Sequence, residues 1–122
     1  MVKPKVKVTF KSFLIVLGII LLFTAIDFFT HSLSKEYAVP GYYYMNKIIF
    51  GAIIGFVAYI FVRNKKPLPK SLIFSAAVAV LLQARYFLEG YPLSFVIEFL
   101  FIHFAILLAI SYPVFKLLKK YI

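Results

Sequence analysis

The sequence predicts an all-α integral membrane protein, a bundle of four transmembrane helices joined by short loops. The chain has 122 residues, of which 64% are hydrophobic and 15% charged. Soluble domains are about 45–50% apolar and about 25% charged, and a chain this short could not hide so much apolar surface from water. Four apolar stretches are long enough to cross a bilayer, and short segments that contain proline separate them.

The four stretches comprise residues 12–30, 43–62, 71–88 and 93–115, and we expect them to form a single membrane domain. Prolines at 40, 67, 69 and 92 come just before the second, third and fourth stretches. Because proline fits the first turn of a helix and not its interior, these residues mark helix boundaries. The first stretch follows a basic tail, as in a signal peptide, but no small-residue cleavage site follows it. We therefore expect it to remain as a helix.

Positive charge predicts the orientation of the bundle. Eleven of the fourteen basic residues, and no acid, lie in the N-terminal segment 1–11, in segment 63–70 and in the C-terminal segment 116–122. These segments fall on one side of a four-span protein, and by the positive-inside rule that side is cytoplasmic. We expect a cell-membrane protein with both termini in the cytoplasm. The net charge of +10 is then a topological signal, so the lipid bilayer is the expected partner and nucleic acid is not.

The opposite half of the bundle carries all four acids and most of the tyrosines. Tyrosine favours the membrane interface because its ring is apolar and its hydroxyl is wet. Six of the nine tyrosines are expected there: Tyr37, Tyr42, Tyr43, Tyr44, Tyr86 and Tyr91. We interpret them as an interfacial belt.

Four ionisable residues enter the spans at one depth, roughly 5–9 Å below the outer boundary; they are Asp27, Lys47, Arg85 and Glu98. A charge costs about 2.5–3.5 kcal/mol at the membrane centre, so matched acids and bases predict neutralisation across the two helical hairpins, Asp27 with Lys47 and Arg85 with Glu98. Glu89 is a further partner for Arg85 at i,i+4. We interpret the layer as a polar pocket that opens outward. The alternatives are purely structural salt pairs and basic side chains that snorkel to the surface.

Both histidines lie near this layer. His31 follows Asp27 by four residues, so the two share a helix face and could bind a divalent metal or relay a proton. The simpler interpretation is a solvated histidine at the interface. His103 lies near the membrane midplane, where its imidazole needs a partner such as Gln83 or a hydroxyl. At 100° per residue, His103 is about 140° from Glu98 around the helix, so a single ligand could not readily contact both.

Lys47 shares a helical stripe with Gly51, Gly55 and Ala58. Small residues at this spacing permit another helix to approach closely. We therefore expect Lys47 to point into protein rather than lipid. Stripes of this kind also indicate contacts with copies of the chain or with a larger membrane complex.

The sequence favours transport over catalysis. No phosphate-binding glycine loop, zinc-protease motif or serine elbow is present, and the absence of cysteine excludes disulfides and thiolate zinc sites. We therefore expect no catalytic residues and no cofactor, and the sequence leaves a metal open. The leading hypothesis is a transport, flippase or channel-like protein whose charged layer takes a polar or anionic ligand or a lipid headgroup. The alternatives are an accessory or assembly subunit of a membrane complex and an intramembrane lipid-modifying enzyme that uses Asp27, His31, Glu98 or His103.

Overall fold

The computed structural model describes residues 7–121, which form four long helices and one short 3-10 helix. The elements are α1 (Phe10–His31), η1 (Lys35–Tyr37), α2 (Tyr42–Val62), α3 (Pro67–Leu88) and α4 (Leu93–Leu117). Each α-helix is long and apolar enough to cross a membrane, since about 20 residues rise the 30 Å of the hydrocarbon core. The predicted all-α, four-span class is confirmed.

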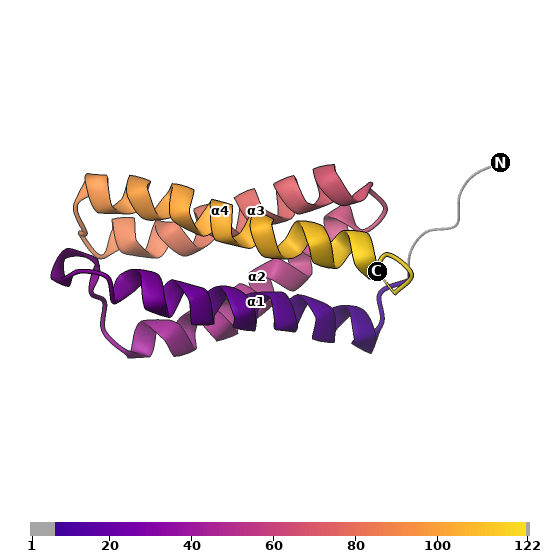
Figure 1. Cartoon of the computed structure of the whole chain (residues 1–122), viewed down its shortest axis with the longest axis horizontal. Helices are drawn as coiled ribbons and strands as arrows, with labels where there is room; N and C mark the ends of the chain where they lie inside the picture. The colour runs from indigo at the N-terminus through magenta and orange to yellow at the C-terminus, as the bar shows by residue number, and fades with distance from the viewer. Residues whose placement is uncertain (1–6, 122) are drawn as a thin grey trace.

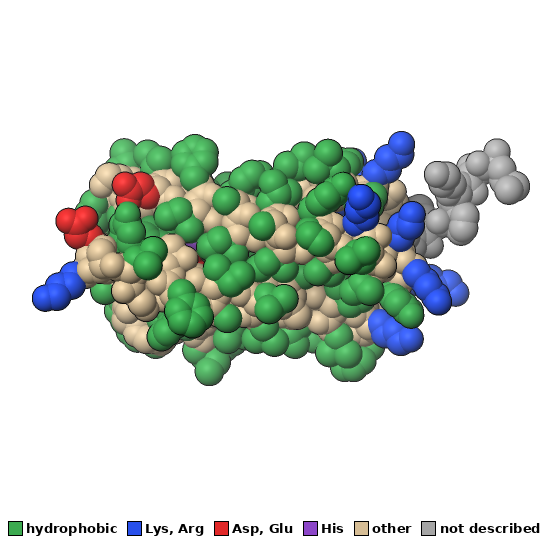
Figure 2. All heavy atoms as spheres, viewed as in Figure 1, with side chains coloured by type: hydrophobic (Ala, Val, Ile, Leu, Met, Phe, Trp, Pro, Cys, Tyr) green, Lys and Arg blue, Asp and Glu red, His purple; other side chains and the backbone are tan. Residues whose placement is uncertain are grey.

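The helices run up and down in an antiparallel bundle (Figure 1). Each helix packs against the one before and after it, and α1 closes the bundle against α4. Segments 32–41 and 89–92 connect helices at one end, which we call the acidic end because Glu36 and Glu89 lie there. The opposite, basic end holds segments 7–9, 63–66 and 118–121. In Figure 2 the acidic side chains in view lie at one end, next to a basic side chain, and the other basic side chains in view lie at the opposite end.

Local sequence signals explain where the helices begin and reverse. Thr9 and Ser12 form a capping box at the start of α1, each side chain accepting a hydrogen bond from the other's backbone N–H. Helix α3 begins at Pro67, four residues before the stretch predicted from the sequence, because Pro67 and Pro69 both fit within its first turn. Between α3 and α4, Gly90 adopts a φ of 85°, in the left-handed region that favours glycine.

The outside of the bundle is apolar over most of its length. Large side chains such as Phe61 and Leu88 are each 81% exposed, and Figure 2 shows hydrophobic side chains over the face in view between the two charged ends. Inside, the main core is built of aliphatic and aromatic side chains from all four helices, including Ile20, Tyr59, Phe74 and Leu107. An apolar surface of this extent matches a lipid surround rather than water.

The small-residue stripe of α2 packs inside the chain. A Cβ at Gly51 would lie 3.0 Å from the side chain of Ile20, and one at Gly55 would lie 3.2 Å from that of Val16, both on α1. Ala58 is half-buried against the same core. The stripe therefore brings α1 and α2 of one chain together, and so it is no argument for a contact with another protein.

This packing predicts that the substitution Gly51→Leu destabilises the bundle. Overpacking of a filled core costs about 1–3 kcal/mol, and Ile20 leaves little room for the new side chain. Gly18→Leu is the matched control, because nothing lies within 4 Å of a Cβ at Gly18. Thermal unfolding in mild detergent should show a lower midpoint for Gly51→Leu and little change for Gly18→Leu. Equal midpoints for the two variants would contradict the close packing of α1 against α2.

Candidate functional site

A single carboxylate, that of Asp27 on α1, joins three helices near the acidic end. Its Oδ2 forms an ion pair with the ammonium of Lys47 on α2. Its Oδ1 lies 2.8 Å from Nε2 of His103 on α4. On its own helix, Nε2 of His31 lies 3.2 Å from Oδ2. We call Asp27, His31, Lys47 and His103 the buried charge cluster.

The cluster is shielded from solvent. Asp27 and His103 are 0% exposed, His31 is 1% exposed and Lys47 is 4% exposed. Moving a charged side chain out of water costs several kcal/mol. A close partner of opposite charge and further hydrogen bonds are needed to offset this cost. Lys47 therefore points inward to Asp27 instead of extending to the surface. The structure thus brings together the first of the two pairs suggested by the sequence.

His31 is held in one orientation and one tautomer. Its Nδ1 lies 2.6 Å from the backbone carbonyl oxygen of Tyr37. A carbonyl only accepts, so Nδ1 carries the hydrogen and donates it, and the lone pair of Nε2 faces the ammonium of Lys47 at 3.0 Å. The ring also stacks on Phe99, with centroids 4.2 Å apart. The interpretation of His31 as a solvated histidine is wrong, because η1 folds back over the end of α1 and covers it.

The second suggested pair does not form. Nε of Arg85 binds Oε1 of Glu89, the residue that follows α3, at 3.1 Å, and the guanidinium lies 4.5 Å from the ring centroid of Tyr43. Glu98 is exposed on α4, away from Arg85. The reason is the rotation of α4, which turns His103 to the bundle centre and so turns Glu98 outward. The four residues at one depth therefore do not form one pocket.

The partner of His103 is also different from the one suggested. Gln83 donates its amide hydrogen to the backbone carbonyl of Val96 at 2.8 Å, whereas His103 binds Asp27. Nδ1 of His103 and the hydroxyl of Tyr86 are buried and have no hydrogen-bond partner within residues 7–121. The sequence indicates neither fact, because both depend on how α1, α3 and α4 are rotated about their axes.

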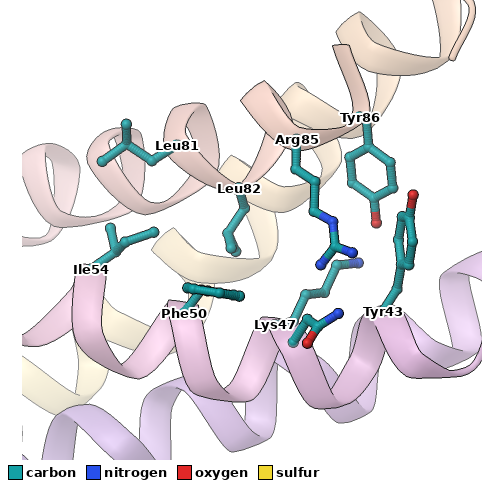
Figure 3. Close-up of a pocket in the computed structure, with 9 residues that line it drawn as sticks. Tyr43, Lys47, Phe50, Ile54, Leu81, Leu82, Arg85 and Tyr86 are labelled. Carbon is teal, nitrogen blue, oxygen red and sulfur yellow. The ribbon is translucent and has the colours of Figure 1, made fainter. Parts of the chain in front are cut away.

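A groove between α2 and α3 adjoins the cluster and has a volume of about 240 Å³. Lys47 and Arg85 line its polar part, and Phe50, Ile54 and Leu81 line its apolar part. Figure 3 shows these side chains converging from the two helices, with the Arg85 guanidinium pointing toward α2. Phe50 and Leu81 are about half exposed, so the groove opens on the side of the bundle. We call it the lateral groove.

A second hollow lies at the acidic end and is lined by His31, Ser34, Lys35 and Tyr44 among others. Its volume is about 530 Å³ and it is wide open. We call it the end hollow. The buried charge cluster therefore lies between two hollows, with Lys47 lining the lateral groove and His31 lining the end hollow.

Three members of the cluster have the chemistry of a metal site. Asp27, His31 and His103 each offer one ligand atom, and these atoms all lie within 4.8 Å of one another. No other such group occurs within the described part of the chain.

Comparison with known proteins adds no assignment, since no family, curated protein or solved structure matches the sequence or the fold.

The cluster predicts a large difference between single and double substitutions. Asp27→Asn should destabilise the protein by about 3–5 kcal/mol, because it leaves the Lys47 ammonium buried without a counter-charge. The double variant Asp27→Asn/Lys47→Met removes both charges and should recover most of that loss. Reversible unfolding in mixed detergent micelles measures both values.

The exposed pair of Arg85 and Glu89 is the control. Its side chains are 35% and 39% exposed, so Arg85→Met/Glu89→Gln should cost less than about 1 kcal/mol. The single variant Lys47→Met completes the comparison. If the stability losses of Asp27→Asn and Lys47→Met added up to the loss of the double variant, the two side chains would not interact, which would contradict the buried ion pair.

Proposed function

We propose that this four-span membrane protein is a small transporter of the flippase or channel type that takes an amphiphile with an anionic headgroup into the lateral groove. The observation that carries the proposal is the division of the groove into a cationic part and an apolar part. Lys47 and Arg85 line the first part, while Phe50, Ile54 and Leu81 line the second. A lipid has the same division between headgroup and acyl chain.

Arg85 is the residue best suited to hold the headgroup. Its guanidinium is partly exposed, and only Nε is used in the bond to Glu89. The terminal nitrogens point across the groove in Figure 3. A planar guanidinium binds phosphate or carboxylate oxygens through two parallel N–H bonds. Lys47 lies beside it, but its charge is paired with Asp27 and two of its three donors are directed to Asp27 and His31.

The apolar part of the groove suits a hydrocarbon chain. From Lys47 to Ile54 the helix rises about 10 Å, and the lining over this length is aromatic and aliphatic. Because the groove opens on the side of the bundle, a lipid could enter it from the bilayer without passing through water. A headgroup that continued toward the end hollow would pass the buried charge cluster, which separates the two spaces.

Lipid binding tests the first part of the proposal. Native mass spectrometry of the protein in mild detergent should show retention of phosphatidylglycerol in preference to phosphatidylcholine. Arg85→Met should weaken phosphatidylglycerol binding by about 10- to 100-fold, the equivalent of one charge-assisted hydrogen-bonded contact. Arg85→Lys should give an intermediate loss, because it keeps the charge without the planar fork.

Lys35→Gln is the matched control, since Lys35 is an exposed cation at the same end and lies outside the lateral groove. An equal loss in Arg85→Met and Lys35→Gln would contradict the groove as the binding site. Reconstituted vesicles with a labelled anionic lipid test movement: the natural chain should speed transbilayer exchange and Arg85→Met should reduce it. Binding without exchange would contradict transport.

A further inference from the structure

We propose that Asp27, His31 and His103 form a binding site for one divalent transition-metal ion such as Zn²⁺, and that the Lys47 ammonium occupies this site when the metal is absent. The proposal does not depend on lipid transport through the lateral groove. It rests on the geometry of the three ligands, on the tautomers of the two imidazoles and on the position of Lys47.

The ligand set has the composition of an open zinc site. Two imidazoles and one carboxylate bind Zn²⁺ at about 2.0–2.2 Å and leave a fourth position for water or another ligand. Tetrahedral coordination at these bond lengths places ligand atoms roughly 3.3 Å apart. Nε2 of His31 lies 3.2 Å from Oδ2 of Asp27 and Nε2 of His103 lies 2.8 Å from Oδ1, and one ligand atom from each of the three residues lies within 4.8 Å of the other two. The three ligand atoms are therefore already close together, and coordination requires the Lys47 ammonium to move away from two of them.

The surroundings of His31 match those of a metal-binding imidazole. Such a histidine donates its other ring N–H to a carboxylate or a backbone carbonyl, which fixes the tautomer and the ring direction. His31 does this through Nδ1 and the carbonyl of Tyr37, and its stacking on Phe99 holds the ring plane. The lone pair of Nε2 is therefore already directed at the place where the metal would lie.

His103 can change tautomer by giving up one hydrogen bond within the described chain, the bond from its Nε2 to Asp27. At present its Nε2 carries the hydrogen that is donated to Asp27, because the carboxylate only accepts. Its Nδ1 has no partner within the described chain, so no other residue selects the tautomer. Moving the hydrogen to Nδ1 exposes the Nε2 lone pair to the metal.

Lys47 is placed as a stand-in cation. Its ammonium binds Oδ2 of Asp27 and Nε2 of His31, two of the three atoms that would coordinate the metal. Asp27 is the buried acid of the described chain, whereas the glutamates at 36, 89 and 98 are exposed. Ammonium and metal therefore compete for one carboxylate. Lys47 also lines the lateral groove, which provides space for its side chain when the metal displaces it.

The end hollow provides access for the ion. His31 forms part of its wall, so this hollow extends from the acidic end to the edge of the buried charge cluster. The polar residues Ser34 and Tyr44 also line this space. The metal ion thus enters from the end of the bundle, and the displaced Lys47 ammonium moves toward the lateral groove on the side of the bundle.

Zinc binding by the purified full-length protein tests the proposal. The protein is stripped with a chelator, placed in nanodiscs of neutral lipid and titrated with ZnCl₂ against a chromophoric chelator, with stoichiometry taken from native mass spectrometry. The natural chain should bind one Zn²⁺. Lys47→Met should bind it about tenfold more tightly or better, because the competitor and its like charge are gone. Co²⁺ in place of Zn²⁺ should give the visible absorption of a tetrahedral site.

Two variants locate the site. Asp27→Asn/Lys47→Met keeps the cluster neutral, so it should fold and lose the bound zinc. Glu98→Gln changes an exposed acid on α4 and should bind like the natural chain. Circular dichroism checks that each variant is folded. Absence of one-to-one binding by the natural chain, zinc retained by Asp27→Asn/Lys47→Met, or no gain in Lys47→Met would each overturn the proposal. Because the nanodiscs contain only neutral lipid, zinc binding is measured without the anionic lipid proposed for the lateral groove.

Discussion

The ion pair between Asp27 and Lys47 is the constraint on which the rest of the acidic half depends. Either charge alone in the apolar interior would be too costly to bury, so each determines the position of the other. The pair requires α1 and α2 to lie close together. Gly51 and Gly55 on α2 make that approach possible, because they have no side chain where α1 packs. His103 adds α4 to the same carboxylate. One buried acid thus fixes the relative rotation of three helices.

The remaining features follow from shielding this pair. The η1 segment covers the end of α1 and supplies the carbonyl that orients His31. Aromatic rings surround the cluster, with Phe99 stacked on His31 and Tyr86 within 5.5 Å of the Lys47 ammonium. The cluster nevertheless remains in contact with two open spaces. Lys47 lines the lateral groove and His31 lines the end hollow.

Much of the fold could be predicted from the sequence, because the length of an apolar stretch and its prolines determine where a spanning helix lies. The pairing of Asp27 with Lys47 was also within reach, since both lie at one depth on adjacent helices. The contact of His103 with Asp27 was not, because 76 residues separate them and depth does not indicate which helices meet at the bundle centre. The burial of His31 depends on a short irregular segment without periodicity. The outward direction of Glu98 follows from a rotation that only the packed bundle establishes.

The Lys47 ammonium lies on the Asp27 carboxylate inside the bundle. Solid-state NMR in lipid bilayers tests it most directly, by the dipolar coupling between ¹⁵N at Lys47 Nζ and ¹³C at Asp27 Cγ. The buried ion pair should give a strong coupling and a rigid lysine side chain. A mobile Lys47 with no coupling to Asp27, as expected for a side chain that extends to the membrane surface, would contradict it.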